Sequence, residues 1–345
     1  MQLFALQNES TEEQVRLREQ TELKKTSNGL GFFILIYFLI MQGLNILIAR
    51  SVNESGIVTV DNQVILTFYL HIICAVASSL SAVLIYRIFS RSKISAAFPK
   101  SHVPIKTLAP LVMLGMGVSM IANYFVVIFD SNISVFRLKN SAVMFTSTRS
   151  TPEILLYVIS VAVVPALAEE LAFRGVLMGV LRKYGDAFAI MASSIMFAAM
   201  HGNTTQIIFA FTVGLIFAFV DCKANSIVPS IIIHFINNFY SVLTDVMLVN
   251  RMVDYNTAAL LRLGMMIMFS LLGLLSFIYL SRTDKSFFRV SNADPNRCSD
   301  TDVLSFKKKL ECFFLSLGVL LSLVLFTTEM IIFLLPDDIR SMIPW

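Results

Sequence analysis

Two adjacent carboxylates, Glu169 and Glu170, interrupt an apolar stretch of the sequence. If that stretch lies in a bilayer, each ionised carboxylate costs about 2.5 kcal/mol or more, so it should face a protein interior or a wet cavity. Arg174 follows Glu170 by four residues, a spacing that places both side chains on one helix face. We predict an ion pair between them. Glu169 points elsewhere and remains the carboxylate available for chemistry.

Two of the four histidines lie within apolar stretches of the sequence and also have a motif partner one helical turn away. His201 has Phe197 one helical turn before it, and His234 has Asn238 one turn after it. A carboxylate and an imidazole can take and relay a proton, and hydrogen-bond donors stabilise negative charge better in a dry site than in water. The pair of His234 and Asn238 offers two such donors to a single point.

The elements that must position these residues are membrane helices. Of 345 residues, 56% are hydrophobic and only 14% are charged, whereas soluble domains carry about 25% charged residues. Apolar runs of roughly 18 to 25 residues recur, each long enough to cross a bilayer as a helix. We therefore predict an all-α, polytopic transmembrane helical bundle of about nine spans (eight to nine). The spans are expected near residues 30–49, 64–86, 107–129, 152–181, 186–203, 204–221, 226–248, 257–281 and 311–335.

The predicted spans put the three candidate groups at compatible depths. Counted at about 1.5 Å per residue from Lys183, Asp186 and Ala224, which are expected at the cytoplasmic face, Glu169, His201 and His234 lie roughly 21, 22 and 15 Å deep. Helix tilt can absorb the remaining difference. Three sites on three separate spans can therefore form one shared site.

These residues resemble the motifs of the CPBP intramembrane proteases, which include the type II CAAX prenyl endopeptidases and the bacterial Abi proteins linked to bacteriocin processing and immunity. The motifs occur in the family's order, each within an apolar span: EExxxR at Glu169, Glu170 and Arg174, FxxxH at Phe197 and His201, and HxxxN at His234 and Asn238. Each motif is short, and their joint occurrence carries the resemblance.

The resemblance implies an intramembrane endopeptidase acting on a membrane-associated peptide or protein. Glu169 would be the general base, with His201 helping to activate water. His234 and Asn238 would form the oxyanion hole. The ion pair beside Glu169, together with Phe197, would support the site.

A metal remains an alternative to this cofactor-free site, because Glu169, His201 and His234 could also serve as zinc ligands. The sequence lacks HExxH, and the family is generally regarded as working without a bound metal. A second functional hypothesis is a non-catalytic membrane binding, immunity or scaffold protein that uses the same polar cavity. Glu329, a lone acid in the last span, has no partner that its spacing would predict.

Charge patterning predicts the orientation of the chain. Lysine and arginine concentrate in one set of alternate connecting segments, which places the N-terminus in the cytoplasm. The formal charge of +4 is modest, and no basic patch interleaved with aromatic residues indicates nucleic-acid binding. We expect a bacterial plasma-membrane protein with a cytoplasmic segment (1–29), N-terminal transmembrane helices (30–151), a CPBP-like catalytic core (152–248) and C-terminal transmembrane helices (249–345). The sequence does not define an oligomeric state.

Overall fold

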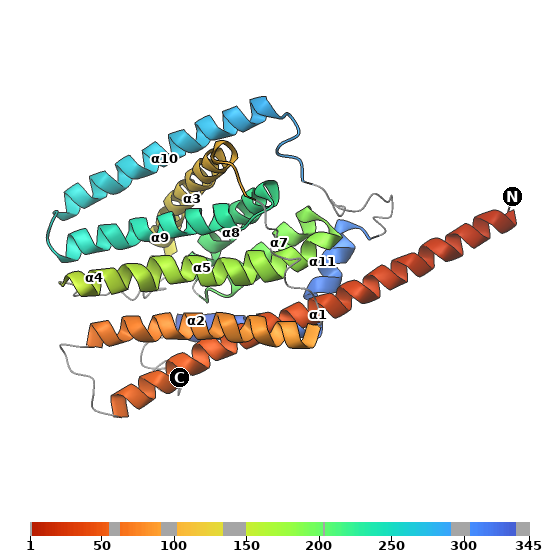
Figure 1. Ribbon diagram of the computed structural model, residues 1–345, viewed down its shortest axis with the longest axis horizontal. Coiled ribbons are helices and arrows are strands. Elements are labelled where there is room, and N and C mark those ends of the chain that lie inside the picture. The colour runs from red at the N-terminus through yellow and green to blue at the C-terminus, as the bar shows by residue number, and fades with distance from the viewer. Residues whose placement is uncertain are drawn as a thin grey trace.

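The computed structural model describes residues 2–54, 63–90, 102–133, 150–202, 204–290 and 304–335. Within these ranges the chain forms helices and no β-strand (Figure 1). The predicted all-α class is therefore confirmed. Most of the segment between the predicted spans 107–129 and 152–181, and the middle of the segment between 257–281 and 311–335, lie outside the described residues.

The described helices follow one another along the chain and several are long enough to span a bilayer. They are α1 (Gln2–Glu54), α2 (Gln63–Ser90), α3 (Ile105–Ile133), α4 (Thr151–Val158), η3 (Ile159–Val163), α5 (Val164–Glu170), η4 (Leu171–Met178), α6 (Gly179–Leu181), η5 (Arg182–Tyr184), α7 (Asp186–Ala199), α8 (Thr204–Ala224), α9 (Val228–Val249), α10 (Tyr255–Thr283), α11 (Phe306–Phe314) and α12 (Leu317–Leu334). Elements α4 to η5 form one interrupted span across Thr151–Tyr184.

The predicted count of nine spans is not confirmed. The described residues contain seven sufficiently long apolar helices, or eight spans if α11 and α12, which meet at a 70° bend, are counted as one. The predicted span at 186–203 corresponds to α7, which has only 14 residues. At about 1.5 Å per residue, α7 is roughly 21 Å long and shorter than the hydrocarbon layer of about 30 Å.

Helices α7 and α8 form an antiparallel hairpin. The two helices pack against each other along their lengths. Arg182, just before α7, donates a hydrogen bond to the side-chain oxygen of Asn225, just after α8, at 2.8 Å. The chain therefore returns to the end of the bundle from which α7 started, and His201 lies partly buried in the turn after α7.

Helix α1 joins the predicted N-terminal segment to the first span without a break. It is 53 residues long, and its candidate span covers Glu13–Leu47. Figure 1 shows its N-terminal part projecting beyond the other helices. The boundary expected near residue 29 therefore falls within a continuous helix.

Glycines allow two pairs of helices to cross in backbone contact. A Cβ atom at Gly318 of α12 would lie 2.4 Å from the carbonyl oxygen of Asn28 on α1, close to Gly31. A Cβ atom at Gly117 of α3 would lie 2.8 Å from the Cα atom of Gly273 on α10. Because lipid provides little hydrophobic drive for helix association, such close approach supplies the stabilising van der Waals contact. The crossings dock α12 on α1 and α10 on α3.

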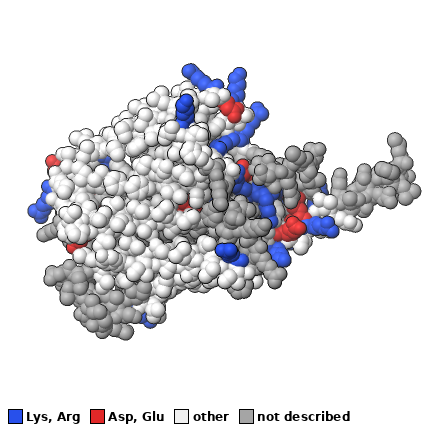
Figure 2. All heavy atoms as spheres, in the orientation of Figure 1, with Lys and Arg blue, Asp and Glu red and all other residues white. Residues whose placement is uncertain are grey.

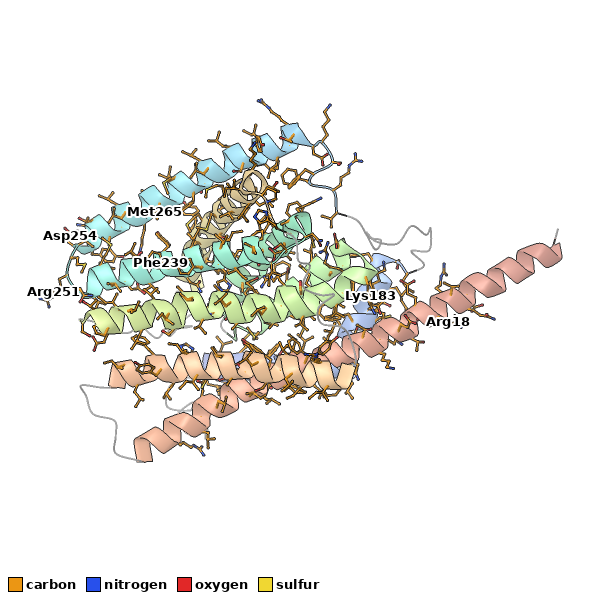
Figure 3. All side chains as sticks on the ribbon, viewed as in Figure 1. Arg18, Lys183, Phe239, Arg251, Asp254 and Met265 are labelled. Carbon is orange, nitrogen blue, oxygen red and sulfur yellow. The ribbon has the colours of Figure 1, made fainter. Side chains whose placement is uncertain are left out.

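Charged side chains gather at the two ends of the bundle and leave a largely apolar middle. Figure 2 shows few charged groups on the central surface and clusters of them toward both ends. Lys183 lies at the end near α11, whereas Arg251 and Asp254 lie at the opposite end (Figure 3). This distribution and the apolar spans identify an integral multi-pass membrane protein.

Candidate functional site

The interrupted span that carries the two acids is opened by a proline. Pro165 has no N–H to donate to the carbonyl of Val161, four residues earlier. The Asn238 side chain of α9 donates its amide hydrogen to that carbonyl at 3.1 Å. The π-helical segments η3 and η4 lie on either side of α5, whose last two residues are Glu169 and Glu170. Such π-helical turns frequently occur at functional sites.

Glu170 is fully buried and is the centre of a polar cluster. Its Oε1 atom lies 3.1 Å from Nη1 of Arg174, which confirms the predicted ion pair. The same oxygen accepts a hydrogen bond from Nδ1 of His234 at 2.8 Å. Glu170 therefore ties its own helix to α9, in addition to pairing with Arg174.

Arg174 is held on several sides although it is only 1% exposed. Its Nη2 atom donates to the carbonyl of Gly214 on α8 at 3.4 Å. Its guanidinium lies 4.2 Å from the ring centre of Phe197 and 5.4 Å from that of Phe217. A desolvated cation over an aromatic face is attracted by about 2 kcal/mol. Arg174 therefore links the helix of the two acids to α7 and α8.

The hydrogen bonds of His234 and Asn238 differ from the paired donors that the sequence predicts. The Glu170 carboxylate can only accept, so Nδ1 of His234 carries a hydrogen and Nε2 is the free ring nitrogen. Asn238 donates one amide hydrogen to the carbonyl of Val161. Because Asn238 replaces the helical hydrogen bond that Pro165 removes, only its second amide hydrogen remains for a ligand.

His201 lies just after α7, and its ring is held by the motif phenylalanine. Its Nδ1 atom lies 2.7 Å from the carbonyl oxygen of Phe197, so Nδ1 donates and Nε2 is free to accept in the neutral ring. The Phe197 ring contacts the imidazoles of both His201 and His234, with ring centres 4.8 and 6.3 Å apart. Phe197 therefore brings the two histidines into one cluster with Arg174.

Glu169 is half-buried and faces a different side of the helix from Glu170. Its Oε2 atom is buried and has no hydrogen-bond partner among the described residues. Its electrostatic neighbours include Tyr37 on α1 and His71 on α2. No motif spacing points to Tyr37 or His71, because both come from helices outside the resemblance. Their place beside Glu169 is a result of packing.

The metal alternative requires several protein ligands around one ion. Within the part of the chain that the structure describes, no group of three histidine, cysteine, aspartate or glutamate residues could hold a metal ion. Glu169, His201 and His234 do not form such a group.

Two further acids near the site have partners that sequence spacing does not reveal. Asp221 at the end of α8 is 1% exposed and accepts the backbone N–H of Ser230 at 3.0 Å. This bond caps the first turn of α9, the helix that carries His234. Glu329 on α12 accepts a hydrogen bond from Gln42 on α1 and lies beside Gly202. The only sequence signal for either acid is its occurrence within an apolar span.

Comparison with protein families matches residues 151–240 to a family described as type II CAAX prenyl endopeptidase Rce1-like. The matched segment extends from α4 into α9 and contains all three motifs. No curated protein and no solved structure matches the chain.

Proposed function

We propose that this protein hydrolyses peptide bonds of membrane-associated substrates within the bilayer, because residues 151–240 match the Rce1-like type II CAAX prenyl endopeptidase family. The family and the apolar spans support a membrane protease. The contrast between the two adjacent acids carries the assignment of the base. Both acids keep a buried Oε2 atom without a hydrogen-bond partner among the described residues, but Oε1 of Glu170 is already engaged by a guanidinium and an imidazole.

Glu169 is the general base in this proposal. A carboxylate with a free oxygen can accept a proton from a water molecule in hydrogen-bond reach. Glu170 is unsuited to that role, because a proton on either of its oxygens would remove the charge that pairs with the buried Arg174. The free Nε2 atom of neutral His201 can accept a hydrogen bond from the same water and orient it.

His234 and Asn238 are the proposed donors to the oxyanion. For that role Nε2 of His234 must also carry a hydrogen, and the Glu170 carboxylate at Nδ1 stabilises the resulting imidazolium. The second amide hydrogen of Asn238 completes the pair. Donors held by fixed hydrogen bonds need little reorganisation during the reaction, which is the basis of oxyanion stabilisation in a dry site.

The reaction consumes one water molecule. Its oxygen attacks the peptide carbonyl carbon while one proton passes to Glu169, and the carbonyl oxygen becomes an oxyanion that receives hydrogen bonds from His234 and Asn238. The carbon–nitrogen bond then breaks as Glu169 returns the proton to the leaving nitrogen. The products are a carboxylic acid, which keeps the second hydrogen of the water, and an amine.

The proposed orientation places the N-terminus of α1 in the cytoplasm of a bacterial cell. This rests on the excess of lysine and arginine in the segments that share a membrane face with that terminus. A cysteine introduced near residue 16 and labelled with a membrane-impermeant reagent in intact and opened cells measures the orientation. Labelling of intact cells would reverse it.

A cleavage assay with matched glutamine variants tests the function. The purified full chain in lipid nanodiscs is incubated with a library of membrane-tethered peptides, and products are identified by mass spectrometry. We expect Glu169→Gln to lower the cleavage rate by about 10²- to 10⁴-fold, the usual contribution of a general base. Glu153→Gln is the control, because Glu153 lies in the same span but belongs to its N-terminal capping box, and glutamine also serves in that motif.

The result that contradicts the mechanism is cleavage by Glu169→Gln at the rate of the control. A wild-type protein that binds peptides of the library without cleaving them would instead favour the non-catalytic binding hypothesis. Unfolding curves of both variants that match the wild type ensure that a lost rate reports on chemistry.

A further inference from the structure

A hollow of about 450 Å³ opens between α1 and the bend that joins α11 to α12. It is remote in sequence from the three motifs, and its walls include side chains of Lys24, Lys25, Lys308 and Glu311. Leu315 and Leu317 line it as well. The hollow therefore combines a basic wall with an apolar one.

The lysines that line the hollow outnumber the acidic side chains that line it. Lys308 forms an ion pair with Glu311, with Nζ and Oε2 3.1 Å apart. Lys24 and Lys25 are exposed and have no ion-pair partner among the described residues. Lys24 and Lys308 both act electrostatically on Cys312, which also lines the hollow. Lysines from two helices far apart in sequence therefore face one space, and three lysines oppose one glutamate.

The shape of the hollow is determined by close helix packing. Asn28 on α1 accepts the backbone N–H of Gly318 on α12 at 2.8 Å. Ser322 on α12 donates to the carbonyl of Gly31 on α1 at 2.9 Å. The glycine crossing beside these bonds holds the two backbones in contact. Helix α11 then turns away from α12 by 70°, so the lysines lie on walls that are firmly connected.

The hollow lies where a lipid headgroup would meet the protein. Lys24 and Lys25 come just before the apolar stretch of α1, and Figure 2 shows basic side chains gathered at the end from which α1 projects. Leu315 and Leu317 are 70% and 59% exposed, which favours contact with acyl chains. Basic pockets between helices at the cytoplasmic face are suited to anionic headgroups. A soluble anion has no hydrocarbon chain that could contact the two exposed leucines.

We propose that this hollow binds an anionic phospholipid, with its phosphate among Lys24, Lys25 and Lys308 and its acyl chains along Leu315 and Leu317. The site is separate from the proposed catalytic residues. Its occupation would hold the α11–α12 bend against α1 at the membrane surface. Stabilisation by lipid therefore does not depend on whether the protein cleaves peptides.

Thermal unfolding of the full chain tests the proposal with phosphatidylglycerol as the probe. The midpoint temperature and the half-saturating lipid concentration are measured in neutral detergent with added phosphatidylglycerol, phosphatidylcholine, glycerophosphoglycerol or inorganic phosphate. We expect phosphatidylglycerol alone to raise the midpoint. Replacing Lys24, Lys25 and Lys308 together by glutamine should weaken the effect by about fivefold per lysine, on the order of 100-fold in all.

The matched control removes three exposed lysines outside the hollow, Lys106, Lys285 and Lys307, and should keep the wild-type response. Glu311→Gln should strengthen phosphatidylglycerol binding, a gain that misfolding cannot produce. Equal weakening in both triple variants, or equal stabilisation by phosphatidylcholine, overturns the proposal. Equal stabilisation by inorganic phosphate or glycerophosphoglycerol also overturns it, because the site would then bind a soluble anion.

Discussion

Removing the guanidinium of Arg174 should destabilise the protein more than removing any exposed arginine. Arg174 is 1% exposed and neutralises the fully buried Glu170 at 3.1 Å. Arg174→Met preserves much of the side-chain volume but leaves the Glu170 carboxylate buried without a cation. The hydrogen bond from His234 remains, yet a single imidazole donor does not replace the guanidinium.

The expected loss follows from the burial of the pair. Breaking a buried ion pair by removing one partner costs about 3–5 kcal/mol, because an uncompensated charge remains. Glu170→Gln in the Arg174→Met background removes that charge, while its amide oxygen can still accept the hydrogen bond from His234. The double variant should therefore be more stable than the sum of the single losses predicts, with a coupling of about 2–3 kcal/mol.

Equilibrium unfolding in mixed micelles with increasing dodecyl sulfate, followed by far-ultraviolet circular dichroism, measures these free energies. Arg262→Met is the matched control, because its contact with Asp245 is 3.4 Å long and the two side chains are 45% and 37% exposed. Such surface pairs contribute about 0–1 kcal/mol. A loss for Arg174→Met no larger than that of the control, or strictly additive losses in the double variant, would refute the reasoning.

Two further predictions concern the proline interruption and a glycine crossing. Asn238→Ala should cost about 1–3 kcal/mol in the same unfolding assay, because it leaves the carbonyl of Val161 unpaired. The loss should shrink in a Pro165→Ala background, where residue 165 again has a backbone N–H that can bond to this carbonyl. An equal loss in both backgrounds would contradict this account. Gly318→Leu should abolish disulfide cross-linking between cysteines placed on α1 and α12, because its Cβ atom would overlap the α1 backbone. Gly264→Leu, at a position with open space, should leave the cross-link intact.

Local spacing along a helix predicted part of the site correctly. Glu170 and Arg174 are four residues apart, and helix geometry alone puts them on one face, so their ion pair could be inferred before any packing was known. The same geometry turns Glu169 away from that pair. The all-helical class likewise follows from apolar runs of spanning length, because a bilayer requires every backbone hydrogen bond to be satisfied within the segment.

The length of the apolar run at 186–203 predicted a complete span, whereas α7 has only 14 residues. The apolar run at 186–203 is long enough to count as a span, but the helix ends at Ala199 and the turn that follows carries His201. Hydropathy cannot distinguish a complete span from a shorter helix enclosed by protein. The difference depends on the neighbouring helices that cover the polar turn.

The sequence by itself determined the membrane-helical class, the three motifs and the Glu170 to Arg174 pair, because these depend on composition and on the repeat of a single helix. Only the tertiary structure decided that His234 bonds to Glu170, that Asn238 serves the carbonyl freed by Pro165, and that α1 and α2 bring Tyr37 and His71 to Glu169. The physical reason is that a hydrogen bond between helices requires atoms to approach within about 3 Å. The rotation and crossing of whole helices, which no local spacing encodes, set that approach.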